Sequence, residues 1–257
     1  MSRIASVFVR ARHTALIPYI TVGYPTIETT LKAVPLFASI GCDIIELGIP
    51  FSDPLADGAT IQQASYEALK QGVTSEACFE VARELRQRVE TPLVFMTYYN
   101  PVLRFGPEQF CSKCADVGID GLIVPDLPPE EGEDLEGPTR RYGLDLVYLL
   151  SPASTQERIR LVASRSSGFI YLVSLTGVTG ARDRLPEGLE RFVDGVRERT
   201  DKPLCVGFGV SSPEEARRVA EVADGVIVGS RLIQLLDRDK SLKNACSFIR
   251  SLRETLS

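Results

Sequence analysis

The sequence contains few of the residues that most often bind metal ions. Of its 257 residues only one is a histidine, His13, and the six cysteines are spread along the chain. A tetrahedral zinc site normally needs four nitrogen or sulfur ligands, so no metal centre is expected. The CSKC segment at 111–114 has the spacing of a metal or redox pair. The same spacing also places two thiols on one helix face, which is the interpretation we favour.

Long apolar runs and basic clusters are missing as well. The N-terminus has no continuous apolar segment like that of a secretory signal. The longest uncharged run, 13–27, is too short and too interrupted by proline and glycine to cross a bilayer. With a net charge of −5, the pair Arg182 and Arg184 is too small a basic cluster for nucleic acid. We therefore expect a cytoplasmic protein that binds neither membranes nor nucleic acid.

Short apolar runs recur along the chain with unusual regularity. Each is rich in Val, Ile, Leu and Tyr and is bounded by Gly, Pro or Asp, as is typical of strands buried on both faces. They lie at 15–23, 42–49, 92–100, 121–126, 144–152, 168–175, 203–210 and 224–230.

Helical patterns separate these runs, and several begin with a capping residue such as Ser212. A further helix is expected at 59–72, inserted between the second strand and its own helix. The spacing of Ile4, Val7 and Phe8 predicts a short N-terminal helix packed on the domain. The remaining helical patterns lie at 26–41, 75–90, 154–166 and 211–223.

Strands that alternate with helices in this way predict a closed parallel (β/α)₈ barrel, a TIM barrel, of the α/β class. A small residue, an aspartate and an apolar strand recur at the second, fourth and eighth strands, which supports this fold. The alternative is an open, doubly wound sheet. No segment resembles a linker, so residues 1–257 are predicted to form a single TIM-barrel domain.

The catalytic groups of such a barrel stand at the carboxyl ends of the strands. Glu46 has the same parity as Ile44 and Gly48 in the second strand, so its carboxyl group projects from the strand itself. No basic residue lies between Lys32 and Lys70 to pair with it. Glu46 is either a structural residue bonded to a distant arginine or backbone amide, or a general acid and base whose pKa is raised by burial.

Two further acids, Asp53 and Asp57, follow in a loop rich in proline and glycine. Loop aspartates commonly form turns. This loop, however, leaves the carboxyl end of the strand that carries Glu46. All three acids are therefore predicted to lie at one end of the barrel, within reach of one ligand.

Glycine and serine end the seventh and eighth strands, in VGFGVSS (206–212) and IVGSR (227–231). The loops after these strands, together with a helix N-terminus, form the recurring phosphate site of this fold. The alternative is that the glycines only make tight turns. The segment 175–188 has the composition of a flap over the site or of an ordinary disordered loop.

The segment IELGIPFSDPLADG at 45–58 resembles the signature of the tryptophan synthase α subunit family. Members of that family are (β/α)₈ barrels that cleave indole-3-glycerol phosphate to indole and glyceraldehyde 3-phosphate. Their β subunit carries pyridoxal phosphate and converts the indole to tryptophan. Further similar segments cover essentially the whole chain, and they lie at 17–25, 96–102, 172–180, 206–216 and 226–230.

The resemblance implies a carbon–carbon lyase of tryptophan biosynthesis, with no cofactor in this chain and a β partner in an α2β2 complex. A free-standing lyase that releases indole without a β partner is the alternative. Pro50 and Asp53 match loop positions that communicate with the β subunit. Ala59 stands where the family usually has proline, and Leu175-Thr176 replaces a pair closer to Arg-Ala. Both departures bear on loop motion rather than on catalytic groups.

The resemblance also implies roles for individual residues. Glu46 would be the general acid and base, and Asp57 would hold the indole N–H. Tyr171 would assist beside Glu46, and Thr179 would order the flap. The apolar indole pocket would be lined by Tyr19, Met96, Ile123 and Phe208. The phosphate would be bound by Gly180, Gly209, Gly229 and Ser230.

The expected retro-aldol cleavage needs an electron sink. The sequence offers no metal cluster, and no lysine stands at a strand end to form a Schiff base. Protonation of indole C3 supplies the sink within the substrate, and Asp57 would stabilise the positive charge at N1–H. Glu46 would donate this proton and then accept the glycerol hydroxyl proton, which requires a pKa near neutrality.

Overall fold

The computed structural model of the chain describes residues 1–10, 13–173, 188–207 and 209–257. Within these residues, nine strands form one parallel sheet in the order β5-β4-β3-β2-β1-β9-β8-β7-β6. The strands are β1 (Ala15–Thr21), β2 (Ile45–Gly48), β3 (Leu93–Met96), β4 (Gly121–Ile123), β5 (Asp145–Val147), β6 (Leu149–Leu150), β7 (Ile170–Val173), β8 (Leu204–Gly207) and β9 (Gly225–Val228).

The two edges of this order, β5 and β6, are consecutive in the chain and are separated by Tyr148 alone. The Tyr148 N–H donates to Ser166 Oγ (3.1 Å), and its carbonyl accepts the Tyr171 N–H (3.0 Å). The predicted strand 144–152 is therefore divided at one residue and joins both edges of the sheet. The closed barrel is confirmed, and the open doubly wound sheet is not formed.

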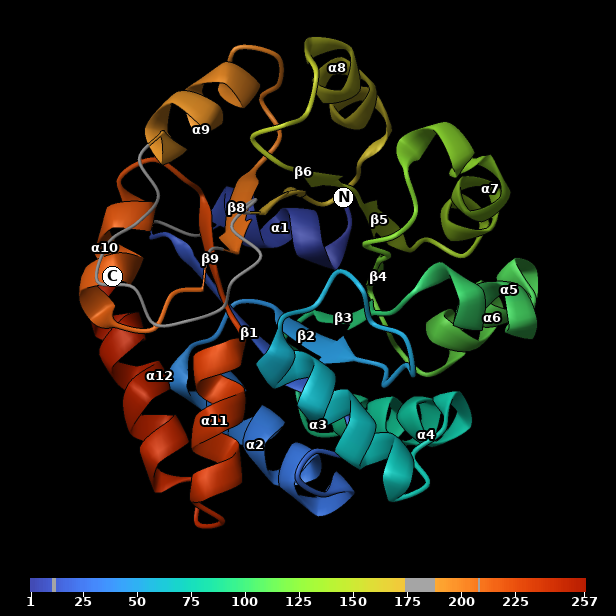
Figure 1. The fold of residues 1–257 in the computed structure, drawn as a ribbon, viewed down its shortest axis with the longest axis vertical. Helices are drawn as coiled ribbons and strands as arrows, with labels where there is room; N and C mark the ends of the chain where they lie inside the picture. The colour runs from blue at the N-terminus through green and yellow to red at the C-terminus, as the bar shows by residue number, and fades with distance from the viewer. Residues whose placement is uncertain (11–12, 174–187, 208) are drawn as a thin grey trace.

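Helices surround the strands as a ring, which Figure 1 shows along the short axis of the molecule. Every predicted helix is present, including α3, the helix inserted after the second strand. The helices are α1 (Arg3–Arg10), α2 (Ile27–Ile40), α3 (Ala59–Lys70), α4 (Ser75–Arg86), α5 (Tyr99–Phe105), α6 (Pro107–Asp116), η1 (Pro129–Glu131), α7 (Glu133–Arg141), α8 (Gln156–Arg165), α9 (Leu189–Arg197), α10 (Pro213–Ala220), α11 (Ser230–Arg238) and α12 (Lys243–Thr255). In the described part of the chain no helix is long and apolar enough to cross a membrane.

Side chains on the strands alternate between the barrel interior and the layer beneath the helices. On β1, Ile17 belongs to the interior cluster, whereas Leu16 and Ile20 pack in the layer under the helices. All seven residues of β1 are buried. Because both faces are covered, the strands read as continuous apolar runs in the sequence.

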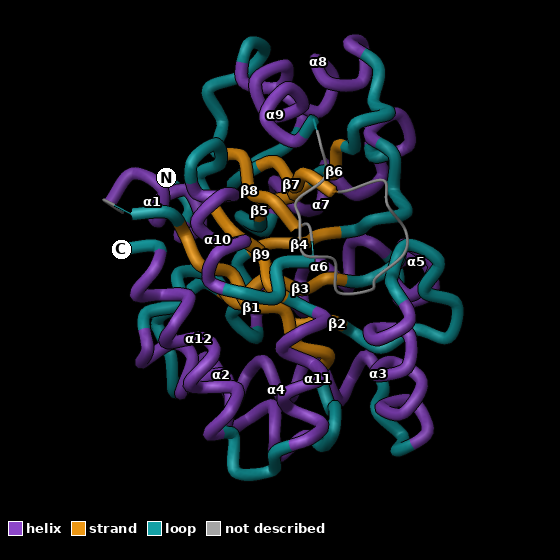
Figure 2. Tube along the Cα trace, turned by 60° about the vertical axis from the view of Figure 1, so that its left-hand side comes forward, coloured by secondary structure: helices purple, strands orange, loops and turns teal. Residues whose placement is uncertain are grey.

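The N-terminal helix α1 closes one end of the barrel. Ile4 is fully buried among interior side chains, and the ring centroid of Phe8 lies 6.1 Å from that of Phe169. Figure 1 shows α1 across the centre of the ring, and Figure 2 shows it from the side. Phe169 directly precedes β7, so α1 covers the end where the strands begin. The carboxyl ends of the strands are left to form the site.

Candidate active site

Glu46 lies inside the barrel on β2, next to Tyr19 of β1 and Val94 of β3. Its side chain is fully buried, and neither carboxyl oxygen has a hydrogen-bond partner among the residues that the structure describes. Burial disfavours the charged form and raises the pKa of Glu46 to about 8. An ion pair with a distant arginine, the structural alternative, is not found in the described part of the chain. A carboxyl group with this pKa can both donate and accept a proton near neutral pH.

Asp57 lies in the loop that leaves β2 and is half-buried. Its Oδ2 accepts a hydrogen bond from Tyr98 Oη (3.0 Å), and its backbone carbonyl accepts one from Gln62 Nε2 (2.9 Å). Burial raises the pKa of Asp57 to about 6, and the hydrogen bond from Tyr98 opposes that rise. At neutral pH Asp57 is therefore mainly ionised, whereas Glu46 is mainly protonated.

Two buried tyrosines, Tyr19 and Tyr171, share this site with the acids. Burial raises the pKa of both phenols, and the charges of Glu46 and Asp57 raise it further. Both carboxylates affect the pKa of each phenol, so the four side chains belong to one electrostatic site. The structure thus brings together three of the predicted catalytic residues and one of the predicted pocket residues.

Two glycines make room for these tyrosines. A Cβ atom on Gly48 would lie 2.1 Å from Tyr19 Oη, and a Cβ atom on Gly207 would lie 2.5 Å from Tyr171 Oη. Both distances are far below van der Waals contact, so any larger residue would displace the ring. These roles were missed in the sequence, where glycine at a strand end indicates only a turn or a close approach.

The apolar wall of the site comes from neighbouring strands and from the inserted helix. Met96 and Ile123 are paired in the register of β3 and β4. Met96 packs against both the interior cluster and a second cluster that holds Tyr19 and Ala64. Ile61 of α3 packs against the same second cluster. Helix α3 therefore contributes to the mouth of the barrel, as Figure 1 also shows by its place beside α11.

The helix N-termini after β8 and β9 differ in their capping. At α10, Ser212 Oγ accepts the Glu215 N–H (3.3 Å), and the Glu215 carboxylate accepts the Ser211 N–H (2.7 Å). At α11 the N-cap residue is Gly229, which has no side chain to cap with, and Ser230 follows as the first helical residue. The first amides of α11 therefore remain available to an anion. Gly209 lies in the turn between β8 and α10.

Asp53 does not join the group of titratable side chains. It is exposed on the loop after β2, where its carboxylate accepts a hydrogen bond from Ser52 Oγ. Pro50 is buried at the base of this loop. Of the three predicted acids, Glu46 and Asp57 therefore act on the pKa values of the same two tyrosines, and Asp53 lies exposed outside this group.

Some predicted features lie outside the described residues. They comprise three site residues and most of the predicted flap, including the departure from the family pattern within it. They are Thr179, Gly180, Phe208 and the segment 174–187 with Leu175-Thr176.

The largest omission from the sequence analysis is Tyr98. It lies two residues beyond the end of β3, is 5% exposed and donates to Asp57. The segment TYYN contains two consecutive tyrosines, and nothing in the sequence separates the one that binds Asp57 from its neighbour Tyr99. Only its place after a strand, at the carboxyl end, marks it as a candidate.

The CSKC segment is a face of helix α6, as favoured above. Cys111 and Cys114 are fully buried in the layer beneath the helices, and burial raises the pKa of Cys111 to about 12. These thiols therefore act as small apolar residues. In the described ranges, no group of three or more His, Cys, Asp or Glu side chains is placed to hold a metal ion.

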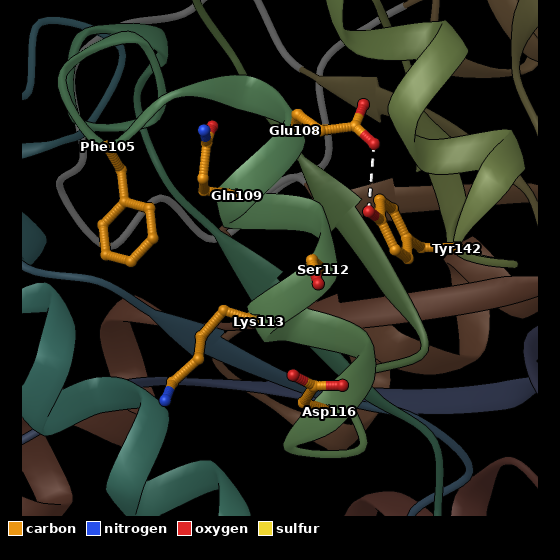
Figure 3. A pocket seen from close by; sticks show the side chains of 7 residues that line it. All are labelled: Phe105, Glu108, Gln109, Ser112, Lys113, Asp116 and Tyr142. Atoms are coloured by element: carbon orange, nitrogen blue, oxygen red, sulfur yellow. Dashed lines mark hydrogen bonds between the residues drawn. The ribbon is translucent and has the colours of Figure 1, made fainter.

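A polar depression of about 280 Å³ lies on the outside of α6, away from the barrel mouth. Figure 3 shows Tyr142 and Glu108 meeting at one edge, where the tyrosine hydroxyl donates to the carboxylate (2.9 Å). Its lining comes from α5, α6 and the C-cap residue of α7, and includes neither Glu46 nor Asp57. It is lined by Phe105, Glu108, Gln109, Ser112, Lys113, Asp116 and Tyr142.

The fold and the site together are those of a (β/α)₈-barrel enzyme with two carboxyl groups of different pKa at the mouth of the barrel. The family model of the tryptophan synthase alpha chain matches residues 7–255. The tryptophan synthase alpha chain of Dehalococcoides mccartyi is 56% identical over 256 residues, which cover 100% of each chain. That of a Roseiflexus species is 48% identical over 260 residues, covering 98% of this chain and 100% of the relative.

Solved structures agree with these relatives. A chain of Mycobacterium tuberculosis tryptophan synthase superposes with a TM-score of 0.93 at 37% identity, covering 99% of this chain and 98% of that one. A protein from Aquifex aeolicus superposes with a TM-score of 0.92 at 43% identity, covering 100% and 99%. The chain belongs to the tryptophan synthase alpha chain family.

The predicted family, fold and lyase activity are therefore confirmed. The chain is an enzyme of the family that cleaves indole-3-glycerol phosphate in tryptophan biosynthesis. Membership of the family also implies a β-subunit partner.

Proposed function

We propose that Glu46 and Asp57 carry out the cleavage of indole-3-glycerol phosphate. The observation that supports this is the contrast between the two carboxyl groups. Glu46 is fully buried with a pKa of about 8, whereas Asp57 accepts a hydrogen bond and has a pKa of about 6. One group is ready to donate a proton at the pH at which the other is ionised.

The reaction begins with proton transfer from Glu46 to indole C3. The ring nitrogen then carries positive charge, which the Asp57 carboxylate stabilises through the N1–H. The glycerol hydroxyl next loses its proton to the Glu46 carboxylate, and the bond between C3 and the side chain breaks. The electrons of that bond return to the ring. Indole and an aldehyde are released, and the proton taken from the hydroxyl leaves Glu46 protonated for the next cycle.

The indole part of the substrate binds against an apolar wall, and its phosphate binds at helix N-termini. Tyr19, Met96 and Ile123 line the indole side, with Tyr171 beside Glu46. Gly209, Gly229 and Ser230 bind the phosphate, supported by the N-terminus of α11, which has no side-chain cap. The family resemblance alone supports the roles of the remaining residues. They are Phe208 in the indole pocket, Gly180 at the phosphate and Thr179 in ordering the flap.

The protein works as one domain, residues 1–257, in an α2β2 complex in the cytoplasm. The β subunit carries the pyridoxal phosphate and consumes the indole, and this chain carries no cofactor. The exposed loop after β2 supports a docking role, because Leu55 is 90% exposed and Asp53 is exposed beside it. Family membership is the further support for this partner.

The test is to measure indole formation from indole-3-glycerol phosphate by the whole chain, with and without the β subunit. We expect indole in both cases, at a higher rate with the partner. Tryptophan should form only when the β subunit, its pyridoxal phosphate and serine are all present. If the β subunit neither binds the chain nor changes the rate, the chain is a free-standing lyase. If no indole forms in either case, the assignment of the reaction to this site is wrong.

A further inference from the structure

Tyr98 lies between a rigid strand end and the loop that carries Asp57. On one side, the Thr97 N–H donates to the Ile123 carbonyl (3.0 Å), and the Tyr99 N–H donates to Asp126 Oδ1 (2.8 Å). These bonds fix the residues before and after Tyr98 to the end of β4 and its loop. Tyr98 itself is the N-cap residue of α5 and is 5% exposed.

The Tyr98 hydroxyl makes two hydrogen bonds, and their directions are determined. The Ala56 N–H can only donate, so Tyr98 Oη accepts it (3.0 Å). The hydroxyl proton is then free for Asp57 Oδ2 (3.0 Å), which is an acceptor when ionised. One phenol thus binds two consecutive residues of the loop, one through the backbone and one through the catalytic carboxylate.

The ring of Tyr98 holds the other end of the same loop. It stacks on Phe51, with ring centroids 5.2 Å apart and an interplanar angle of 28°. Phe51 and Asp57 lie toward the two ends of this loop, which runs from 49 to 58. Between them Ser52, Asp53 and Leu55 are exposed and Pro54 is buried. Tyr98 therefore contacts both ends of a loop whose middle is largely exposed.

We infer that Tyr98 is a positioning residue for the cleavage reaction, which holds Asp57 against the indole N–H and favours its ionised form. The inference rests on the proposed role of Asp57. A hydrogen bond to the charged form of a carboxyl group favours that form. Without the Tyr98 hydroxyl, the hydrogen bond that opposes the effect of burial on the pKa of Asp57 would be lost. That pKa would rise, and a smaller fraction of Asp57 would be ionised near pH 6.

The test is Tyr98→Phe in the whole chain, which keeps the ring stacked on Phe51 and removes only the hydroxyl. We expect kcat to fall about tenfold at pH 7.5 with a smaller change in KM, since a hydrogen bond to a charged group is lost. We also expect the acid limb of the kcat profile to shift to higher pH, so that the loss is larger at pH 6 than at pH 8. Tyr99→Phe makes the same change one residue away and should leave rate and profile unaltered.

Two results would overturn the inference. One is a Tyr98→Phe variant with the activity of the parent protein. The other is a loss of equal size at every pH together with a lower thermal midpoint, which indicates a purely structural role. The double variant with Asp57→Asn separates the inference from the proposed function. If Asp57→Asn is about 10²-fold slower and Tyr98→Phe reduces its residual rate no further, the two residues act together. If Asp57→Asn is fully active, the proposed role of Asp57 fails first.

Discussion

Acids at the two ends of the barrel have different partners. Where strands begin, three aspartates each accept a backbone N–H of the neighbouring strand at 2.8–2.9 Å and an arginine from the helical layer. The aspartates are Asp43, Asp120 and Asp224, and their partners are Arg253, Arg86 and Arg197. Where strands end, Glu46 has no such partner among the described residues. Of these four acids, the three paired ones join neighbouring strands to a helix, whereas Glu46 keeps its proton near neutral pH.

This difference also explains the repeated sequence pattern. The second, fourth and eighth strands of that pattern are β2, β4 and β9 of the structure. Each is preceded by one of these aspartates, which pairs with an arginine. Its carboxylate joins adjacent strands to a helix, so the repeat is a device of the fold. The carboxyl ends of the same strands lie at the mouth of the barrel. There β2 carries Glu46, and β9 leads to Gly229 at the N-terminus of α11.

The largest effect is expected for Glu46→Gln. Glutamine has the shape of glutamate but neither donates nor accepts a proton in the reaction, so kcat should fall about 10³-fold. The measurement is indole release at pH 7.5, with circular dichroism to confirm that the fold is kept. A variant that retains a tenth of the activity or more would remove Glu46 from the acid and base role.

At the opposite end, Arg86→Met should destabilise the protein while sparing the chemistry. Arg86 donates to Asp120 Oδ2 (2.7 Å) and to three backbone carbonyls. Its loss leaves the largely buried carboxylate with the Leu93 N–H (2.9 Å) and the more distant Arg3 (3.8 Å) as its partners. We expect the free energy of unfolding in urea to fall by about 3 kcal/mol, with kcat per folded molecule unchanged. Arg83→Met, in the exposed pair on the same helix, is the matched control and should cost less than about 1 kcal/mol. Equal losses for the two variants would contradict the distinction between the barrel ends.

Asp57→Asn keeps the loop contacts to a large extent and removes the negative charge. Since the proposed role of that charge is to stabilise the developing positive charge on the indole ring, kcat should fall about 10²-fold. Asp116→Asn on the exposed side of α6 is the control and should be fully active. An active Asp57→Asn variant would show that the ring charge is stabilised elsewhere.

The smallest expected effect is a gain in stability for Glu46→Gln at alkaline pH. The pKa of Glu46 is about 8 in the folded protein and 4.5 when unperturbed. Between these values the unfolded chain releases the proton that the folded protein keeps, so stability falls as the pH rises through this range. Glutamine does not titrate, and at pH 8 the variant should be more stable by about 2 kcal/mol, with the unpaired amide offsetting part of the gain. A variant that is less stable than the parent at pH 8 would mean that the glutamate is not held neutral.

Much of the fold could be predicted because both faces of every strand are covered. Continuous apolar runs such as 203–210 and capped helices such as the one that follows Ser212 are local signals. The interruption at Tyr148 was not predicted, because it depends on hydrogen bonds to Ser166 and Tyr171 on other segments. A local pattern contains no information on such partners.

The residues of the site were likewise predicted only where the signal was local in the sequence. Glu46 was found because a strand position with inward parity and no local base is a signal within the sequence. Tyr98, Gly48 and Gly207 were missed because their roles are contacts across the barrel mouth. Asp53 and Asp57 have the same local setting in the sequence, and only the structure separates the exposed carboxylate from the half-buried one.

The state of Glu46 is best tested by titrating it directly. Carbon-13 NMR of the chain labelled at glutamate carboxyls, compared with the Glu46→Gln variant, gives a single resonance that belongs to this residue. We expect that resonance to titrate with a midpoint near pH 8, since burial raises the pKa of Glu46 to about 8. A midpoint near the unperturbed value of 4.5 would contradict the division between paired and unpaired acids on which the mechanism rests.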